Sequence, residues 1–361
     1  MPPWLIRRLL IAPLMPLLGV VALVLLPVVA VVNTAVALIL LVARGRRPRW
    51  RVLRVWTFAT AYLLGESACL LVCLALWVAS GFGWKLRSER QQDAHLALIA
   101  AFLRALLAVA QFVFGFRLTV EEPVTRPEDA ERMASAEPIL VLARHAGPGA
   151  SFVLVHLLLS RYRRRPRIVL KQQLRLDPSL DVLLSRIGCS FITTGKGRPD
   201  AAARMIAEVA GTLDDHDALL LYPEGGDWTP TRHRLAVVRL LRTGRRAEAR
   251  QALSMPHVLP PKPAGTLAAL RAAPAADVVV FTHTGHDELA DVVTIWNALP
   301  LRRELHLLWW REKPDALPSD EEQTGQWLTG VWSRIDAWVE EQTDLTQLSE
   351  QTSGGAQRPA V

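Results

Sequence analysis

Hydrophobic residues divide the chain into two regions with different patterns. Before Phe116 they form long, nearly uncharged runs, whereas after Pro138 short apolar runs alternate with amphipathic ones. Long runs are typical of helices in contact with lipid, and short alternating runs are typical of a sheet covered by helices. The pattern predicts membrane-associated helices over residues 1–117, an α/β domain over 118–342 and a polar, disordered tail over 343–361.

The N-terminal region contains two apolar runs of membrane-spanning length, Leu9–Val42 and Val55–Ala79. Prolines interrupt the first run, so a helical hairpin that enters the bilayer without crossing it is an alternative to a span. The arginines of residues 44–54 predict a cytoplasmic loop at the cell membrane. Basic residues also follow the second run, which leaves the number of crossings open. Ala94–Phe116 has a helical period and is expected to lie on the membrane or to connect the two regions.

The region after Pro138 alternates predicted strands and helices. This order predicts an α/β sandwich with a mostly parallel central sheet. The predicted strands are Ile139–Ala143, Arg167–Leu170, Ala218–Tyr222, Asp277–Phe281 and His306–Trp310, and the predicted helices are Ser151–Arg161, Pro178–Ile187, Pro199–Leu213 and Ser319–Glu341. The last helix carries an apolar stripe that indicates core packing, formed by Trp327, Val331, Ile335 and Trp338.

Composition and charge limit the classes of partner. The chain has 361 residues and a formal net charge of +8. Together with the apolar N-terminus, this charge favours an anionic membrane surface or phosphate-bearing substrates over DNA. No zinc-finger, basic-zipper or RNA-binding motif is present, so nucleic acid is not an expected partner. The three cysteines form neither a disulfide framework nor a metal-binding spacing, and we expect no metal.

His145 lies where the first predicted strand of the α/β domain ends. A turn that contains Gly147 and Gly149 follows it, and a helix begins shortly after. In α/β folds, ligands bind at the carboxyl ends of the strands. A neutral imidazole at this place can remove a proton from a bound hydroxyl near pH 7. The alternative is a histidine that only makes hydrogen bonds within the turn.

A second strand end has the same character. The strand Ala218–Tyr222 runs into a Pro-Glu-Gly turn, in which Glu224 and Gly225 are candidates for substrate binding. Glu224 is placed to accept hydrogen bonds from a polyol. The alternative is an ordinary turn with a solvated glutamate.

These blocks, in this order, resemble the glycerolipid acyltransferase family that includes the lysophosphatidate acyltransferases. The similarity covers about residues 138–270. It rests on His145, on residues 169–174 with Lys171, on residues 187–192, on Tyr222–Gly225 and on His257–Pro261. The resemblance implies a membrane-bound acyltransferase that moves a fatty acyl group from acyl-CoA or acyl-carrier protein to a glycerol hydroxyl of a lysophospholipid such as lysophosphatidate. It implies that His145 is the general base and that no cofactor is needed.

The sequence also departs from the family pattern. Ala150 stands where the family has the aspartate that orients the histidine, and Asp227 stands where the third block has an arginine. Asp227 is one residue that could replace the missing carboxylate. Lys171, Lys196 and Arg198 are candidates for phosphate binding, because the arginine of the second block is absent. The alternative function is a catalytically impaired relative that binds lipid or acts as a membrane scaffold.

Three further features carry weaker expectations. Glu66, within the second apolar run, is expected to be either paired or near a helix break at Gly65, because an isolated charge is costly in lipid. The basic segments 161–167 and 239–250 are either solvated or in contact with anionic headgroups. His283, His286 and Asp287 have a spacing that raises a metal site as an alternative to a turn at a strand end.

Overall fold

The computed structural model describes most of the chain. The described residues are 1–45, 49–121, 127–147, 149–192, 199–287, 289, 291–301, 303–312, 317–318 and 320–355. They form two compact units. The first contains Met1–Phe116, Phe152–Gly197 and Trp296–Arg302, and the second contains Arg117–Ser151, Arg198–Ile295 and Arg303–Val361. The division is therefore discontinuous, unlike the single boundary that the sequence predicts at residue 118.

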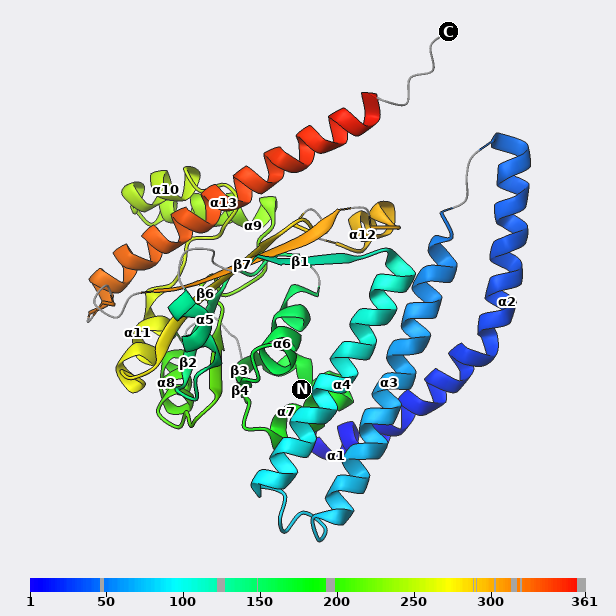
Figure 1. The fold of residues 1–361 in the computed structure, drawn as a ribbon, viewed down its shortest axis with the longest axis horizontal. Coiled ribbons are helices and arrows are strands. Elements are labelled where there is room, and N and C mark those ends of the chain that lie inside the picture. Colours follow the sequence, from blue (N-terminus) through cyan, green and yellow to red (C-terminus); the bar gives the residue numbers. More distant parts are fainter. Residues whose placement is uncertain are drawn as a thin grey trace. The chain divides into compact units, whose positions relative to one another are not determined.

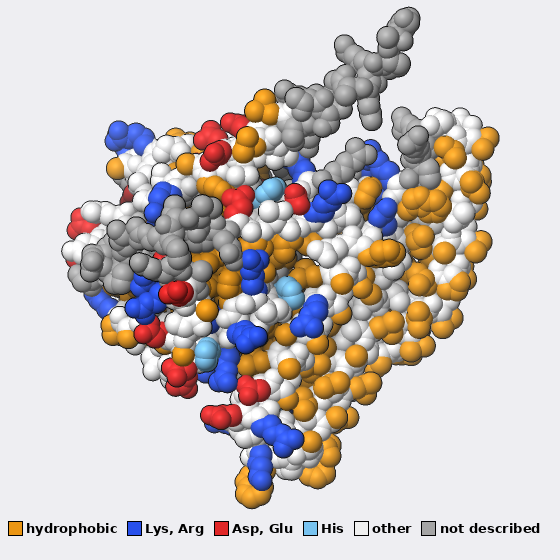
Figure 2. All heavy atoms as spheres, viewed as in Figure 1, with side chains coloured by type: hydrophobic (Ala, Val, Ile, Leu, Met, Phe, Trp, Pro, Cys, Tyr) orange, Lys and Arg blue, Asp and Glu red, His pale blue; other side chains and the backbone are white. Residues whose placement is uncertain are grey.

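Long helices dominate the first unit (Figure 1). The short segments α1 (Trp4–Ile6) and η1 (Arg7–Ile11) lead into α2 (Ala12–Arg44), and α3 (Arg51–Ala79) and α4 (Glu89–Phe114) follow. The helix formed by α1, η1 and α2, together with α3 and α4, gives three helices within the described residues that are long and apolar enough to cross a membrane. Figure 2 shows hydrophobic side chains spread over the surface of α2. The predicted N-terminal apolar helices are confirmed, and α4 also has spanning length.

These helices pack closely where side chains are small. Gly65 of α3 faces Phe102 of α4, and a Cβ atom on this glycine would lie 2.7 Å from the aromatic ring. Between α2 and α3, the Trp56 indole donates a hydrogen bond of 2.9 Å to the carbonyl of Ala22. Glu66, whose side chain is fully buried, is paired as the sequence predicts, since the hydroxyl of Ser179 donates to it.

The remaining elements of the first unit come mainly from residues 152–197. They are most of α6 (Ala150–Ser160), β3 (Arg165–Lys171), the 3₁₀ segment η2 (Gln172–Leu176), α7 (Pro178–Arg186) and β4 (Ser190–Ile192). β3 and β4 pair in parallel, with Val169 opposite Ser190. Asp177 caps α7, because its carboxylate accepts a hydrogen bond of 2.9 Å from the Leu180 amide. α7 packs against α3 and α4, which explains why this segment belongs to the helical unit.

The second unit is built on a sheet. Its strands are β1 (Arg117–Glu121), β2 (Ile139–Ala143), β5 (Asp217–Leu221), β6 (Asp277–Thr284) and β7 (Glu304–Arg311). They lie in the order β1-β7-β6-β2-β5, and every pairing is parallel except that of β6 with β7. All five residues of β2 are buried, as its continuous apolar sequence indicates. The predicted α/β fold with a mostly parallel sheet is confirmed.

The remaining helices lie mainly in the second unit, and the C-terminal helix matters most for the site. They are α5 (Pro127–Ala134), α8 (Pro199–Ala210), α9 (Pro230–Arg242), α10 (Arg246–Leu253), α11 (Pro263–Ala272), α12 (Val292–Ala298), whose residues are divided between the two units, and α13 (Glu321–Gly355). α13 contacts α11 and β6. Leu328, Trp332 and Ile335 lie one turn apart along one face of α13 and are completely buried.

Two expectations differ from the structure. α13 continues to Gly355, so residues 343–355 are helical where the sequence predicts a disordered tail. The polar residues of this segment are compatible with a helix that extends from a packed one, since elongation costs less than nucleation. α5 also forms before β2, at a place where none of the helices predicted from the sequence lies.

Candidate active site

The turns after β2 and β5 meet because these strands are neighbours in register. Ile139 to Leu142 lie opposite Ala218 to Leu221. The backbone continues this contact beyond the strands, since Ala146 forms a bridge with Trp228 and the Trp228 amide donates to the carbonyl of His145. The two strand ends that the sequence singles out therefore form one site.

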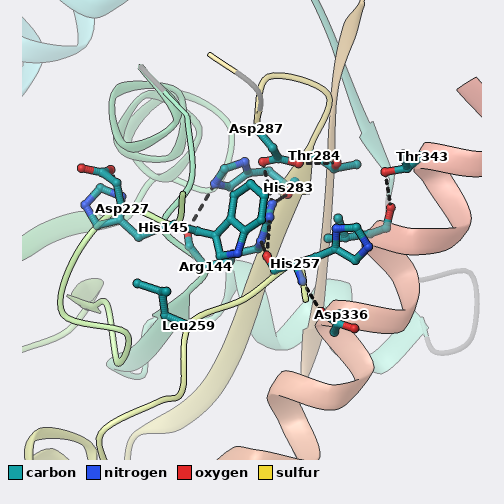
Figure 3. Close-up of polar contacts among 12 residues, drawn as sticks. Arg144, His145, Asp227, His257, Leu259, His283, Thr284, Asp287, Asp336 and Thr343 are labelled. Carbon is teal, nitrogen blue, oxygen red and sulfur yellow. Dashed lines mark hydrogen bonds and ion pairs between the residues drawn. The ribbon is translucent and has the colours of Figure 1, made fainter. Parts of the chain in front are cut away.

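His145 and Asp227 form the ionisable pair of this site (Figure 3). Nδ1 of His145 lies 2.7 Å from Oδ1 of Asp227. The histidine side chain is 25% exposed and the aspartate side chain is 48% exposed, so both are accessible to solvent. Nε2 of His145 has no hydrogen-bond partner among the described residues. Asp227 thus occupies one ring nitrogen and leaves the other open.

Tyr222 forms a platform beneath the imidazole. The two rings have centroids 4.4 Å apart and are tilted by 37°. The Tyr222 hydroxyl donates a hydrogen bond of 2.9 Å to Oγ of Ser151. Burial raises the pKa of Tyr222 to about 12, although the bond to Ser151 opposes the increase. The phenol is therefore neutral near pH 7 and holds the histidine ring by contact.

Glu224 has a different place from the one the sequence predicts. It is only 3% exposed. Its oxygens accept hydrogen bonds from the amide of His145 at 3.3 Å, the amide of Leu259 at 3.1 Å and the Trp332 indole at 3.2 Å. Burial raises the pKa of Glu224 to about 7 against the opposing effects of Arg144 and these donors. The carboxyl group therefore holds the turn from the protein interior, and its contact with a polyol stays a prediction.

Arg144, which sequence reasoning does not single out, supports the same turn from the opposite side. Its guanidinium donates to the carbonyl of His257 at 2.7 Å and to Asp287 at 2.8 Å, and it is completely buried. Its plane also lies over the ring of Trp228, 5.8 Å from the centroid. Burial alone would raise the pKa of Asp287, but the Arg144 charge holds it below its usual value. Arg144 is thus part of a network of buried hydrogen bonds that supports the turn, which we call the framework.

The segment His283–Asp287 serves this framework too. Nε2 of His283 lies 3.2 Å from the carbonyl of Arg144, and Thr284 donates a hydrogen bond of 2.6 Å to Asp287. Burial, with the nearby arginine, lowers the pKa of His283 to about 4, so the ring is neutral. His286 bonds to the carbonyl of Arg303 at 3.2 Å. No group of three His, Cys, Asp or Glu able to hold a metal occurs among the described residues.

α13 closes the framework from a distant part of the chain. Besides the Trp332 bond to Glu224, its Asp336 accepts a hydrogen bond of 2.7 Å from the amide of His257, as Figure 3 shows. The apolar stripe of the sequence predicts that this helix is buried. It gives no signal that an indole and a carboxylate reach the turns of the site.

The other predicted residues have mixed outcomes. Gly225 has a φ of 73°, in the left-handed region that the turn requires. Lys171 is exposed at the end of β3 in the first unit, and Lys196 and Arg198 lie outside the described residues. Ala150, at the family's aspartate position, is buried at the start of α6. The carboxylate beside His145 therefore comes from the turn after β5.

Comparison with known families identifies the segment that carries this geometry. Residues 121–260 match the Acyltransferase family. This segment is similar to the acyltransferase domain that the family shares. The match includes both turns, His145 and Asp227, and it ends before α13. Among curated proteins, no match to the chain is found. The acyltransferase domain thus depends on a helix beyond the matched segment for two hydrogen bonds of its site.

Proposed function

We propose that the protein is a membrane-bound enzyme that transfers a fatty acyl group from acyl-CoA or acyl-carrier protein to a glycerol hydroxyl of a lysophospholipid such as lysophosphatidate. His145 is the general base, and Asp227 performs the role of the carboxylate that is missing at Ala150. The observation that carries this proposal is the distance of 2.7 Å between Nδ1 of His145 and Oδ1 of Asp227 in an acyltransferase domain.

The reaction needs only a proton carrier and two positioned substrates. Nε2 of His145 removes the proton from the glycerol hydroxyl as its oxygen attacks the carbonyl carbon of the thioester. The tetrahedral intermediate then collapses, the carbon–sulfur bond breaks, and the thiolate takes the proton back from the imidazolium. A new ester and a free thiol result, so atoms and charges balance. No acyl-enzyme and no metal enter this sequence.

Asp227 contributes by stabilising one state of the histidine. A carboxylate at Nδ1 keeps the proton on this nitrogen and leaves the lone pair on Nε2 for the substrate. It also stabilises the imidazolium that forms after proton transfer. Because Asp227 is about half exposed, solvent screens the pair, and we expect a smaller contribution than that of a fully buried carboxylate.

The membrane part of the proposal rests on the apolar helices of the first unit. Lysophospholipids and their acylated products reside in membranes, and helices of spanning length keep the domain at that surface. The arginines between α2 and α3 favour an orientation with the domain in the cytoplasm, where acyl thioesters are made. Ala150 remains the feature that favours a catalytically impaired relative.

An assay on the purified full chain in phospholipid nanodiscs tests the proposal. The substrates are oleoyl-CoA and oleoyl-lysophosphatidate, and the readouts are thiol release and phosphatidate detected by mass spectrometry. We expect turnover in the native protein and none above background in His145→Ala. Oleoyl-acyl-carrier protein replaces oleoyl-CoA in a second arm.

The matched control is His216→Asn, at the opposite end of β5. His216 has a left-handed backbone, which asparagine tolerates, and this variant should keep the native rate. Absence of turnover with both donors in a folded native protein, or equal rates for the native protein and His145→Ala, would exclude the proposed catalysis.

A further inference from the structure

Three arginines meet a single aspartate in the helical unit. Asp181 of α7 is only 2% exposed in its side chain. The Nε atoms of Arg7, Arg8 and Arg175 lie 3.1, 3.5 and 3.3 Å from its carboxylate oxygens. Three positive charges and one negative charge give this cluster a net charge of +2. Excess charge of one sign is costly in partly buried surroundings unless an ion of opposite sign accompanies it.

The hydrogen bonds of the cluster are distributed unequally. All three guanidinium nitrogens of Arg7 donate hydrogen bonds. Nε and Nη2 donate to the two carboxylate oxygens of Asp181, and Nη1 donates to the carbonyl of Pro2. Arg8 and Arg175 lie near the same carboxylate without hydrogen-bond geometry. Neither guanidinium donates to any acceptor among the described residues, and the Nε atoms of both are buried. Two donor groups are thus held side by side with no acceptor of their own.

The surroundings of these two arginines are apolar and exposed. Arg175 stacks on Phe191, with its guanidinium 4.5 Å from the ring centroid. Their neighbours along α1, η1 and η2 include large exposed hydrophobic side chains, which lipid would cover in a membrane. These neighbours are Trp4, Leu5, Leu9, Leu174 and Leu176, with exposures of 60, 56, 72, 41 and 48%.

We propose that Arg8 and Arg175 bind the phosphate group of an anionic glycerophospholipid whose acyl chains lie on the exposed apolar side chains beside them. The arginine pair supplies charge-assisted donors that match phosphate oxygens. Arg7 and Asp181 position the pair and remain with each other when the lipid binds. This site lies in the helical unit and goes beyond the acyl transfer proposed for His145.

The location of the cluster favours a lipid over a free phosphate. Arg7 and Arg8 are close to the N-terminal end of the first apolar helix, where a spanning helix meets the headgroup region. A free phosphate would use the same donors but gain nothing from the apolar neighbours. The two sources therefore differ in how binding depends on the acyl chains.

Native mass spectrometry of the full chain in detergent tests this site. The probe is dioleoyl phosphatidate, and dioleoylglycerol, which has the same chains without the phosphate, is the reference lipid. We expect the native protein to retain one bound phosphatidate. The double variant Arg8→Gln/Arg175→Gln should bind this lipid with an affinity at least about tenfold lower. The matched control is Arg87→Gln, which changes an exposed arginine that has no ion pair with any other described residue, and this variant should bind like the native protein.

A stability measurement separates ligand binding from a purely structural role. Asp181→Asn replaces one of the two acceptor oxygens of Arg7 by an amide nitrogen and leaves three arginines without a carboxylate. We expect this variant to unfold at a lower temperature than the native protein in detergent, and phosphatidate to restore most of the difference. Loss of stability that phosphatidate does not restore, together with native lipid retention in the double variant, would refute the site.

The remaining arm uses inorganic phosphate. If this ion at millimolar concentration displaces the bound phosphatidate from the native protein as effectively as an equal concentration of short-chain phosphatidate, the acyl chains contribute nothing and the lipid assignment is wrong. Retention of lipid under these conditions supports it. Because none of these readouts uses catalysis, an inactive protein with an intact lipid site remains distinguishable from the reverse.

Discussion

Arg144 and His145 are neighbours in the sequence, yet they have opposite roles. Arg144 is completely buried and its guanidinium is engaged by protein acceptors, whereas His145 is a quarter exposed and keeps Nε2 open. Extended backbone directs successive side chains to opposite sides, so one strand end can place one side chain in the interior and the next toward solvent. The comparison teaches that the reactive group can stay exposed because its neighbour fixes the turn from within.

The largest expected effect separates these two roles by substitution. His145→Ala should lower kcat about 10³-fold or more, because general-base catalysis is lost, while the unfolding temperature changes little. Arg144→Met should instead lower the free energy of unfolding by roughly 3–5 kcal/mol, because Asp287 becomes a buried unpaired charge. Steady-state kinetics and thermal unfolding of both variants measure the two effects. Equal losses of stability in the two variants would contradict the separate roles of Arg144 and His145.

The second prediction concerns the exposed partner of His145. Asp227→Asn should lower kcat about 10²-fold, because the amide no longer stabilises the imidazolium. Adding Ala150→Asp should recover part of the loss, since it places a carboxylate at the family's own position. Asp215→Asn, an exposed aspartate at the other end of β5, is the control for the charge change. A rate for Asp227→Asn equal to that of the control would show that the pair has no catalytic role.

The third prediction follows from the raised pKa of Glu224. The carboxyl proton of Glu224 is bound more tightly in the folded protein than in the unfolded chain, where the pKa of glutamate is 4.5. The contribution of Glu224 to the free energy of unfolding is therefore largest below pH 4.5 and decreases as pH rises through about 7. The change over this window is on the order of 3 kcal/mol. Glu224→Gln lacks this proton, so the stability of the native protein relative to Glu224→Gln should fall from pH 4.5 to 7.5. Thermal unfolding at several pH values measures the difference, and a constant difference would contradict the assignment.

The smallest effect is expected at the adjacent glycines of the turn. Gly225→Ala should cost about 1–2 kcal/mol, because Gly225 has a φ of 73° and its added Cβ would lie 2.6 Å from Nζ of Lys262. Gly226→Ala should cost less, since this glycine lacks a positive φ and its Cβ would lie 3.2 Å from Arg232. Chemical denaturation of the two variants gives the comparison, and a reversed order would show that the turn tolerates the side chain.

The sequence predicts those parts of the fold that depend on local patterns. β2 has the predicted bounds because five consecutive apolar residues between turn signals leave little choice. The meeting of His145 with the Pro-Glu-Gly turn is also predicted, since parallel strands end at the same edge of a sheet. Strands β1 and β4 are not predicted, because each is short and pairs at positions that no alternation marks.

The site itself depends on contacts that no local pattern encodes. The conformation of the loop after β5 places the Asp227 carboxylate beside His145, and the sequence indicates only that Asp227 could make such a contact. Glu224 looks like a solvated turn residue until Trp332, 108 residues later, covers it. Arg144 finds its acceptors at residues 257 and 287. Each of these roles is decided by which distant segment buries the side chain.

The bond from Trp332 to Glu224 has a consequence for the order of assembly. α13 leaves the ribosome after both turns of the site, so the turn that holds His145 lacks one of its donors until translation has passed residue 332. A nascent chain already anchored by its apolar helices would carry an incomplete site during that interval. Synthesis of α13 thus acts as a late step in the maturation of the site, after membrane insertion has begun.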